Sequence, residues 1–389
     1  MAALVTRRRI LTDALTAPLF LSPLAMSATR CDRAKKPPAQ WLVAAQGSDA
    51  STFGLGWAPL TTQAAETEEA EQLPVGFRGH DAVAHPLRSR RVVLVARHPG
   101  REMVEVDLVE GRITRRIRCA KDHVHGGHAC FSADGHLLFT AEVDYAKGEG
   151  RIIVRDSLDY RQLAEFPSYG VGPHELLLMP DGKTLAVANG GLLTHPERPG
   201  EVLNLHTMTS TLTLIASDSG AQLQAFRVDE PKASIRHLSL SDRGELSVAL
   251  QMQRAASTHQ HLAPLAAIYR PERGLEVLHG PEALLWHCED YMGSTRINNR
   301  TRIAGFTSPR GNIALFWHLD RRELVGYHRF HDVCGLAVNP AQDSFLLSNS
   351  AGQLRCLDAS TLQERPDQAL DLPAFAWDNH LHAFTWPTT

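Results

Sequence analysis

The sequence predicts an all-β protein folded as a β-propeller, a ring of small antiparallel sheets called blades. Three observations predict this fold: a repeated unit of strand, tight turn and strand, almost no helical periodicity in the body of the chain, and unmatched strand-like segments at both ends. The chain has 389 residues, of which 43% are hydrophobic and 21% charged, and repeat folds use such a length as one domain. We therefore expect a single propeller domain over residues 31–389.

The repeated unit is clearest at residues 127–135 and 173–182, where a short apolar strand runs into an Asp-Gly turn and a second strand follows. Weaker copies begin at Arg236 and Cys334. Further alternating strands follow each pair, which gives four strands per unit. Repeats of about 40 to 60 residues made of four short strands are typical of propeller blades.

Counting these units predicts six complete blades and a seventh that both chain ends share. Residues 41–75 supply about three further strands and residues 375–384 supply one. Pairing these segments closes the ring and removes two exposed sheet edges. A β-sandwich is the alternative all-β architecture, but it does not explain the repeat. The six complete blades are expected at residues 79–120, 124–167, 172–229, 234–280, 292–330 and 332–370.

The N-terminus has the pattern of a signal peptide. An arginine run at residues 7–9 precedes an apolar run at residues 14–28, which is too short to cross a bilayer as a stable helix. Such a pattern resembles the twin-arginine signal of bacterial proteins that are exported already folded. The alternative, an amphipathic helix, is disfavoured by Pro18 and Pro23. We expect residues 1–30 to be a signal peptide, and the mature protein to lie in the periplasm without a membrane span.

Charge and motifs exclude several function classes. The net charge of −3, from 40 basic and 43 acidic residues, provides no field that would attract nucleic acid. The six cysteines form no C-x-x-C pair, and the sequence has no P-loop, dinucleotide fingerprint, H-E-x-x-H or G-x-S-x-G motif. Ordinary cofactor enzymes are therefore disfavoured, and the sequence identifies no catalytic residue.

Histidine and acidic residues recur near the start of the strand that opens each unit. In a propeller this innermost strand lines the central tunnel, and its first residues face the mouth where ligands usually bind. If strand side chains alternate strictly, only one of His174 and Glu175 points into the tunnel. The candidate metal ligands are His80, His128, His237 and His380, and the candidate ligand-binding residues are His174, Glu175, Arg236 and Asp332.

Imidazoles and carboxylates that converge from separate blades suit copper, iron or zinc. The alternative is structural, because a histidine at this position can instead bond the backbone or a hydroxyl group of the neighbouring blade. The long segment from Asn189 to His206 is a candidate cover for the tunnel mouth, with a plain surface loop as its alternative.

A string of motifs over about residues 75–350 resembles a family of uncharacterised bacterial propellers exported by the twin-arginine route. These proteins are relatives of the quinoprotein amine dehydrogenase-like and surface-layer-type seven-bladed propellers. The likeness departs from the usual pattern in the acidic stretch 64–71 and at residues 298–301. The motifs that carry it are Gly127-His128, 131–135, 140–145, 170–176, 188–191, 194–196, 203–205, 234–238, 308–311 and 332–336.

The resemblance brings no catalytic residues. It implies a role beside imelysin-like proteins and haem-type peroxidases, which are linked to periplasmic iron acquisition and would be the partners. We therefore expect a periplasmic propeller that binds a metal ion or a protein partner in such a system. The alternative is a metal-dependent oxidoreductase or lyase that uses the histidine and glutamate residues at the tunnel mouth.

Overall fold

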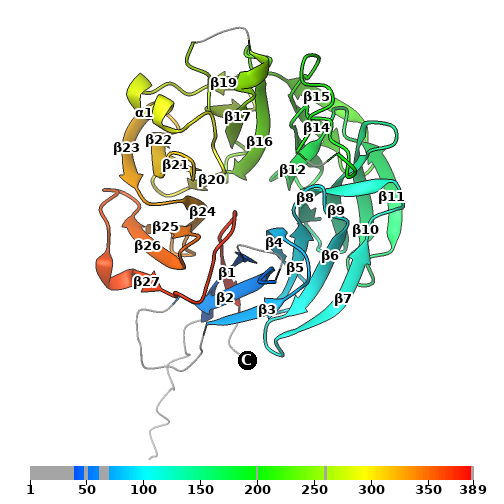
Figure 1. The fold of residues 1–389 in the computed structure, drawn as a ribbon, viewed down its shortest axis with the longest axis horizontal. Coiled ribbons are helices and arrows are strands. Elements are labelled where there is room, and N and C mark those ends of the chain that lie inside the picture. The colour runs from blue at the N-terminus through cyan, green and yellow to red at the C-terminus, as the bar shows by residue number, and fades with distance from the viewer. Residues whose placement is uncertain (1–38, 48–50, 61–69, 199, 258–260, 387–389) are drawn as a thin grey trace, which may run out of the picture. The chain divides into compact units, whose positions relative to one another are not determined.

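The computed structural model describes residues 39–47, 51–60, 70–198, 200–257 and 261–386. These residues form seven four-stranded antiparallel sheets arranged as a ring around a central axis (Figure 1). The predicted all-β class and the predicted seven-bladed propeller are both confirmed. The expected signal peptide, with Cys31 just after it, lies outside the described residues.

Six blades are built from four consecutive strands each, with the innermost strand first in the chain. The first is β4 (Gly79–Ala84), β5 (Arg91–Ala96), β6 (Glu102–Asp107) and β7 (Arg112–Arg118). The second is β8 (His123–Phe131), β9 (Leu137–Asp144), β10 (Glu149–Asp156) and β11 (Gln162–Pro167). The third is β12 (Pro173–Leu178), β13 (Thr184–Asn189), β14 (Thr211–Ala216) and β15 (Gln222–Phe226).

The next three blades follow the same order. The fourth is β16 (Ala233–Leu240), β17 (Leu246–Met252), β18 (Ala266–Arg270) and β19 (Gly274–Val277). The fifth is β20 (Ser294–Asn298), β21 (Ile303–Ser308), β22 (Ile313–His318) and β23 (Glu323–Arg329). The sixth is β24 (Val333–Val338), β25 (Ser344–Asn349), β26 (Gln353–Asp358) and β27 (Leu370–Asp371).

The two ends of the chain share the seventh blade, as predicted. Its strands run in the order β28 (His382–Trp386), β1 (Ala39–Gln46), β2 (Gly54–Pro59) and β3 (Glu71–Pro74). β28 pairs with β1 in antiparallel register, with Trp41 opposite Phe384. This pairing closes the ring and leaves neither strand as a free edge.

Helix is confined to short pieces in the described part of the chain. They are α1 (Glu282–His287) and two single 3-10 turns, η1 (Arg254–Ala256) and η2 (Pro366–Gln368). No helix among the described residues has the length and apolarity that a membrane crossing would need.

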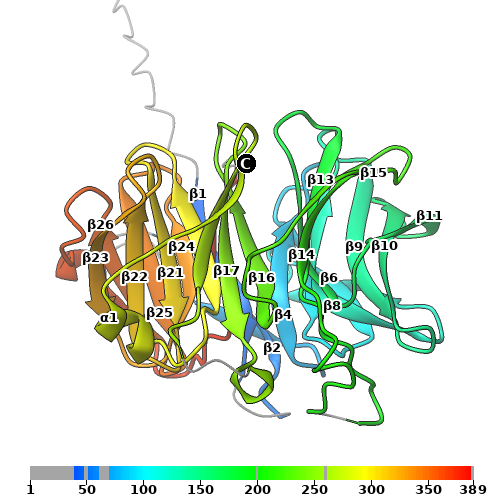
Figure 2. The same cartoon turned by 90° about the horizontal axis from the view of Figure 1, so that it is seen from above.

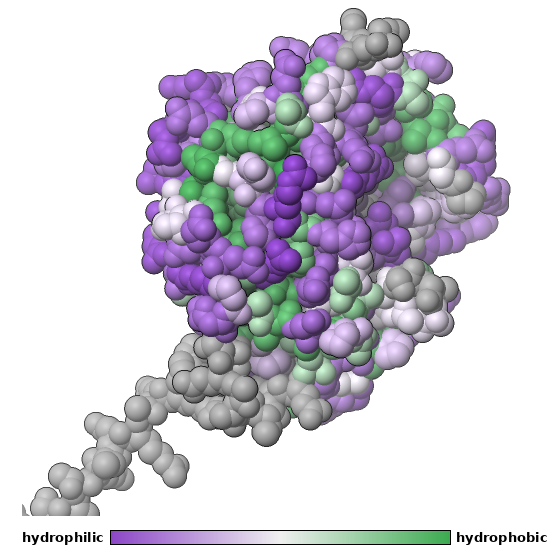
Figure 3. Space-filling view, turned by 60° about the vertical axis from the view of Figure 1, so that its left-hand side comes forward, coloured by the Kyte–Doolittle hydropathy of each residue, from purple (hydrophilic) through white to green (hydrophobic). Residues whose placement is uncertain are grey.

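The core consists of apolar layers between neighbouring blades. Strands near the ring interior are buried on both faces, so they read as continuous apolar runs such as Val92–Ala96 of β5. Trp317 is fully buried between the fourth and fifth blades, and its indole N–H donates a 2.8 Å hydrogen bond to the carbonyl of His279. Figure 3 shows hydrophilic residues over most of the outer face that it presents, with apolar residues in smaller groups between them. Large exposed apolar side chains such as Trp286 and Tyr327 are few.

The ring has two different faces. Every innermost strand starts at one of them, here called the mouth face, and the three longest loops flank those starts: residues 190–210, 253–265 and 278–293. The mouth face points downward in Figure 2, where the green loop between β13 and β14 projects. The connections at the opposite face are shorter; one of the longest joins β26 to β27 over residues 359–369. Loop length therefore singles out the mouth face as the place where function is expected.

Candidate metal centre

Five imidazole rings meet at the tunnel mouth, each from a different blade. Neighbouring ring centroids lie between 4.4 and 5.8 Å apart. All five side chains are at most 3% exposed. We call this set the histidine group; it consists of His80, His128, His174, His237 and His380.

Register shifts in the innermost strands bring these side chains together. Between Pro173 and Leu176 the pairing of β12 with β13 shifts, so His174 and Glu175 together oppose a single position of β13. The expectation that strict alternation sends only one of them into the tunnel is wrong, because this bulge turns both toward it. The other shifts are at Gly79/Asp81 on β4, His125/Ala129 on β8, Ile235/His237 on β16 and Val333/Gly335 on β24.

The shift on β8 depends on glycine. Gly127 has a φ of +121°, a conformation that side chains with a Cβ rarely adopt. A Cβ on Gly127 would also lie 2.5 Å from Cδ2 of His80. The glycine just before His128 therefore permits both the backbone path and the close approach of the His80 ring.

His380 reaches the group from a loop and not from a strand. Residues 375–384 were expected to be the closing strand, but β28 begins only at His382. The preceding segment runs along the end of β1, where the backbone N–H of Asp378 donates to the carbonyl of Ala45 at 3.0 Å. The positive φ of His380 (64°) then ends the extended path. In Figure 1 this red segment reaches toward the centre of the ring.

The Nδ1 atoms of three imidazoles each lie close to an oxygen atom of a neighbouring side chain. Nδ1 of His128 lies 3.1 Å from Oδ2 of Asp81, and Nδ1 of His237 lies 3.3 Å from Oε2 of Glu175. Nδ1 of His380 lies 3.3 Å from the hydroxyl of Ser294. A carboxylate or hydroxyl on one ring nitrogen orients the ring and leaves the other nitrogen for a metal ion.

The opposite nitrogens are buried and have no hydrogen-bond partner among the described residues. They include Nε2 of His128, Nε2 of His380 and Nδ1 of His80. Nε2 of His80 lies 3.2 Å from Nε2 of His174, so one of these two rings donates to the other. Buried polar atoms without partners are costly and rare, so several in one place call for an explanation.

Most rings of the histidine group are neutral. Burial, followed by the charges of neighbouring groups, holds the pKa of His80, His174, His237 and His380 well below its ordinary value. Burial also lowers the pKa of His128, but the carboxylates of Glu175 and Asp81 outweigh that effect and raise it. Neutral imidazole is the form that binds metal ions.

The four predicted metal ligands have the right spacing for one ion. One nitrogen from each of His80, His128, His237 and His380 can be chosen so that all four lie within 4.8 Å of one another. Four nitrogens bound to zinc at about 2.0–2.1 Å lie roughly 3.3 Å apart, so each ring needs to move inward by no more than about 1 Å. The residues present therefore fit a transition-metal ion.

The other predicted site residues lie in three different places. His174 and Glu175 belong to or contact the histidine group, as described above. Arg236 directly precedes His237 and lies beside it at the mouth. Asp332 directly precedes β24, and its carboxylate accepts a hydrogen bond from the hydroxyl of Ser350 in the loop before β26.

A second set of potential ligands, Cys119, His125 and Glu142, is better explained as structural. The Arg155 guanidinium donates to Glu142 at 2.7 Å, and Nδ1 of His123 lies 3.1 Å from the other carboxylate oxygen. These partners, with the charge of His125, lower the pKa of Glu142 to about 2 despite burial. A cation here would have to displace a bonded guanidinium.

Sequence reasoning missed three residues that support the histidine group: Asp81, Ser294 and His382. Nε2 of His382 lies 2.6 Å from Asp81, on the carboxylate oxygen opposite to the one that faces His128. The signal for Asp81 was present, since His80-Asp81 repeats the His174-Glu175 pair of the third blade. Nothing in the repeat marks Ser294, because β20 has no bulge and carries no histidine at that point.

The five described cysteines, which include Cys334 behind the mouth, are all free thiols. No curated protein matches the chain. The family described as "Protein of unknown function (DUF1513)" matches residues 73–384, which covers six complete blades and the first part of the closing strand. The chain therefore belongs to the DUF1513 family.

Proposed function

We propose that this protein binds one transition-metal ion in the histidine group at the tunnel mouth. The observation that carries the proposal is the different surroundings of the two nitrogens on the same rings. Asp81, Glu175 and Ser294 lie beside Nδ1 of three imidazoles. On two of these rings, His128 and His380, Nε2 is buried without a hydrogen-bond partner among the described residues.

The donor set favours borderline metal ions. Four neutral imidazoles suit copper, iron(II) or zinc, whereas magnesium and calcium prefer oxygen ligands. The carboxylates of Asp81 and Glu175 lie behind the rings, where they offset the charge of a bound dication and raise the basicity of the ligands. His174 would support His80 in the same way.

We further propose that the protein works in the periplasm, as a metal-binding component and not as an enzyme. The arginine run followed by an apolar stretch at the N-terminus supports export, and the family likeness supports a link to iron acquisition. Iron(II) is then the ion to test first, and imelysin-like and haem-peroxidase-type proteins are the partners to test for binding.

The test is elemental analysis of protein purified from the periplasm. The wild type should carry about one equivalent of a transition metal, and the His128→Ala, His237→Ala double variant should carry less than a tenth of that. The matched control is His136→Ala, His206→Ala, which removes two exposed imidazoles and should keep the wild-type content. Circular dichroism establishes that each variant is folded.

Two results would overturn the proposal. One is a folded wild type that contains no metal and cannot be loaded with iron(II), copper(II) or zinc. The other is a double variant that keeps its metal, which would place the ion elsewhere.

A further inference from the structure

Arginine side chains gather beside the histidine group at the mouth face. Arg78 donates to Asp378 through Nε at 2.6 Å and through Nη2 at 3.1 Å, and Nη1 of Arg97 lies 3.6 Å from the same carboxylate. The side chains of Arg78 and Arg97 are 45% and 35% exposed, but Nη1 of Arg97 is buried and has no hydrogen-bond partner among the described residues. The charge of Arg97 also acts on Arg236 and on His80, so it lies near both.

Arg236 has no carboxylate partner within ion-pair distance among the described residues. Burial lowers its pKa to about 10, with Tyr291 raising it and Arg97 lowering it. Arg236 is only partly buried, so its guanidinium keeps N–H donors that no carboxylate of the described residues uses. It differs in this from Arg155 and Arg302, which are buried and each contact a carboxylate.

The loop of residues 190–210 lies against one side of Arg236. A Cβ on Gly190 would lie 3.2 Å from Nη1 of Arg236, so the loop backbone passes directly against the guanidinium. Further along the loop, the hydroxyl of Thr194 lies 2.6 Å from Nε2 of His98, the residue after Arg97. The loop is thus tied to the first blade and encloses the arginines from the side.

Positive charge exceeds negative charge around the mouth. Arg78 and Arg97 share the carboxylate of Asp378, and Arg236 has no carboxylate within ion-pair distance among the described residues. The nearby carboxylates Asp81 and Glu175 are engaged by the imidazoles. A bound metal ion would add further positive charge to this surplus.

We infer that Arg97 and Arg236 form a binding subsite for an oxyanion group, carboxylate or phosphate, of a small ligand that lies against the metal ion. The inference rests on the proposed metal site and names the ligand class that would complete it. Planar guanidinium groups bind such oxyanions through two parallel N–H donors. Arg236 directly precedes His237, so an anion held by it lies within reach of the ion that the imidazoles would bind.

The test is calorimetric titration of full-length protein with oxalate and, separately, with inorganic phosphate at constant ionic strength. Each titration is made on metal-free and on zinc-loaded protein, because zinc adds no redox chemistry. Wild type should bind one equivalent of at least one anion, at least tenfold more tightly when zinc is bound. The tighter of the two anions identifies the oxyanion class.

The Arg97→Gln, Arg236→Gln variant should bind that anion at least tenfold more weakly in both forms. The matched control Arg112→Gln, Arg321→Gln removes the same charge from exposed positions away from the mouth and should stay within twofold of wild type. Arg97→Gln alone, at the more exposed position, provides the comparison if the double variant does not fold.

The outcomes separate the two proposals. Anion binding that requires the arginines in metal-free protein, together with no zinc binding, supports the subsite and overturns the proposed function. Zinc binding without anion binding to either form overturns the subsite and leaves the metal site standing. Anion binding that the arginine variants do not weaken also overturns the subsite.

Discussion

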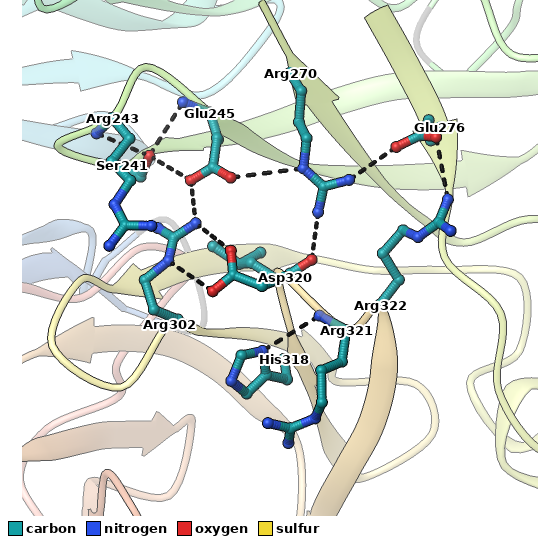
Figure 4. A network of polar contacts seen from close by, with 11 residues as sticks. Ser241, Arg243, Glu245, Arg270, Glu276, Arg302, His318, Asp320, Arg321 and Arg322 are labelled. Carbon is teal, nitrogen blue, oxygen red and sulfur yellow. Dashed lines mark hydrogen bonds and ion pairs between the residues drawn. The ribbon is translucent and has the colours of Figure 1, made fainter. Parts of the chain in front are cut away.

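The two faces of the propeller differ in whether their polar side chains have partners within the protein. On the face away from the mouth, Figure 4 shows a network between the fourth and fifth blades in which every carboxylate meets an arginine. Glu245 contacts Arg302 and Arg270, and Asp320 contacts Arg302 at 2.8 Å. On the mouth face, several buried ring nitrogens have no hydrogen-bond partner among the described residues, and the partly buried Arg236 contacts no carboxylate there.

This difference shows what the architecture can achieve. Each of the three carboxylates in this network contacts an arginine, so the fold is able to pair charges at a blade junction. The unpaired groups at the mouth are therefore not a general cost of building a propeller. Concentrated at one place and surrounded by orienting partners, they indicate a site built for a ligand.

The largest effect should come from breaking the network. Arg302→Met leaves Glu245 buried, with only Arg270 at 3.6 Å and the hydroxyl of Ser241 for support. Removing one partner of a buried pair costs about 3 to 5 kcal/mol, because the remaining charge stays desolvated. Urea denaturation monitored by fluorescence measures the loss.

Arg322→Met is the matched control in the same network. Its side chain is 47% exposed and contacts Glu276 at 3.1 Å, so its loss should change the free energy of unfolding by less than about 1 kcal/mol. Equal losses for Arg302→Met and Arg322→Met would mean that burial does not distinguish the two ion pairs.

A smaller effect is expected at the mouth, and most of it with metal present. His380→Leu should destabilise metal-free protein by about 1 kcal/mol, because it removes the hydrogen bond between Nδ1 and Ser294 while Nε2 has no partner to lose. Zinc at 100 times its dissociation constant should stabilise wild type by about 2.7 kcal/mol and the variant by much less. Thermal unfolding with and without zinc measures both. A loss of several kcal/mol without metal would instead favour a structural role for the histidine group.

The smallest effect concerns acid stability of the network. The Arg302 hydrogen bond holds the pKa of Asp320 below its ordinary value near 3.8. The unfolded chain therefore binds the proton more readily, so this contribution is complete above the ordinary pKa and is lost as pH falls through the folded one. Unfolding free energy should fall less steeply between about pH 5 and pH 2.5 in Asp320→Asn than in wild type. An identical profile would contradict this, and the exposed Asp229→Asn is the control.

The fold was predictable because its signals are local. Alternating strands and glycine turns mark each blade, and the unmatched segments at both ends require each other. The start of the closing strand was predicted too early, at residue 375 instead of His382, because residues 375–381 are apolar enough to resemble an extended strand. Their path depends on the contact of Asp378 with the backbone of Ala45, more than 300 residues away in the chain.

The site was predictable only in part. His80, His128, His237 and His380 were found because the repeat places them at equivalent positions, and the structure brings them together. Bulges depend on pairing register, which the sequence does not display, so the joint inward direction of His174 and Glu175 was not foreseen. Arg97 directly follows β5, the second strand of its blade. It was not predicted, because the repeat marks candidate residues only on the innermost strands. Whether these residues bind a metal stays a prediction.

The closing blade sets an order of events for the newly made chain. Asp378 and His380 are translated long after Arg78 and His80, which they meet across a separation of 300 residues. The donor set is therefore incomplete in every nascent intermediate that lacks the closing strand. A metal ion bound by all four imidazoles would link the closing segment of the chain to the earlier blades. The metal site would therefore be filled only after synthesis and ring closure had both taken place.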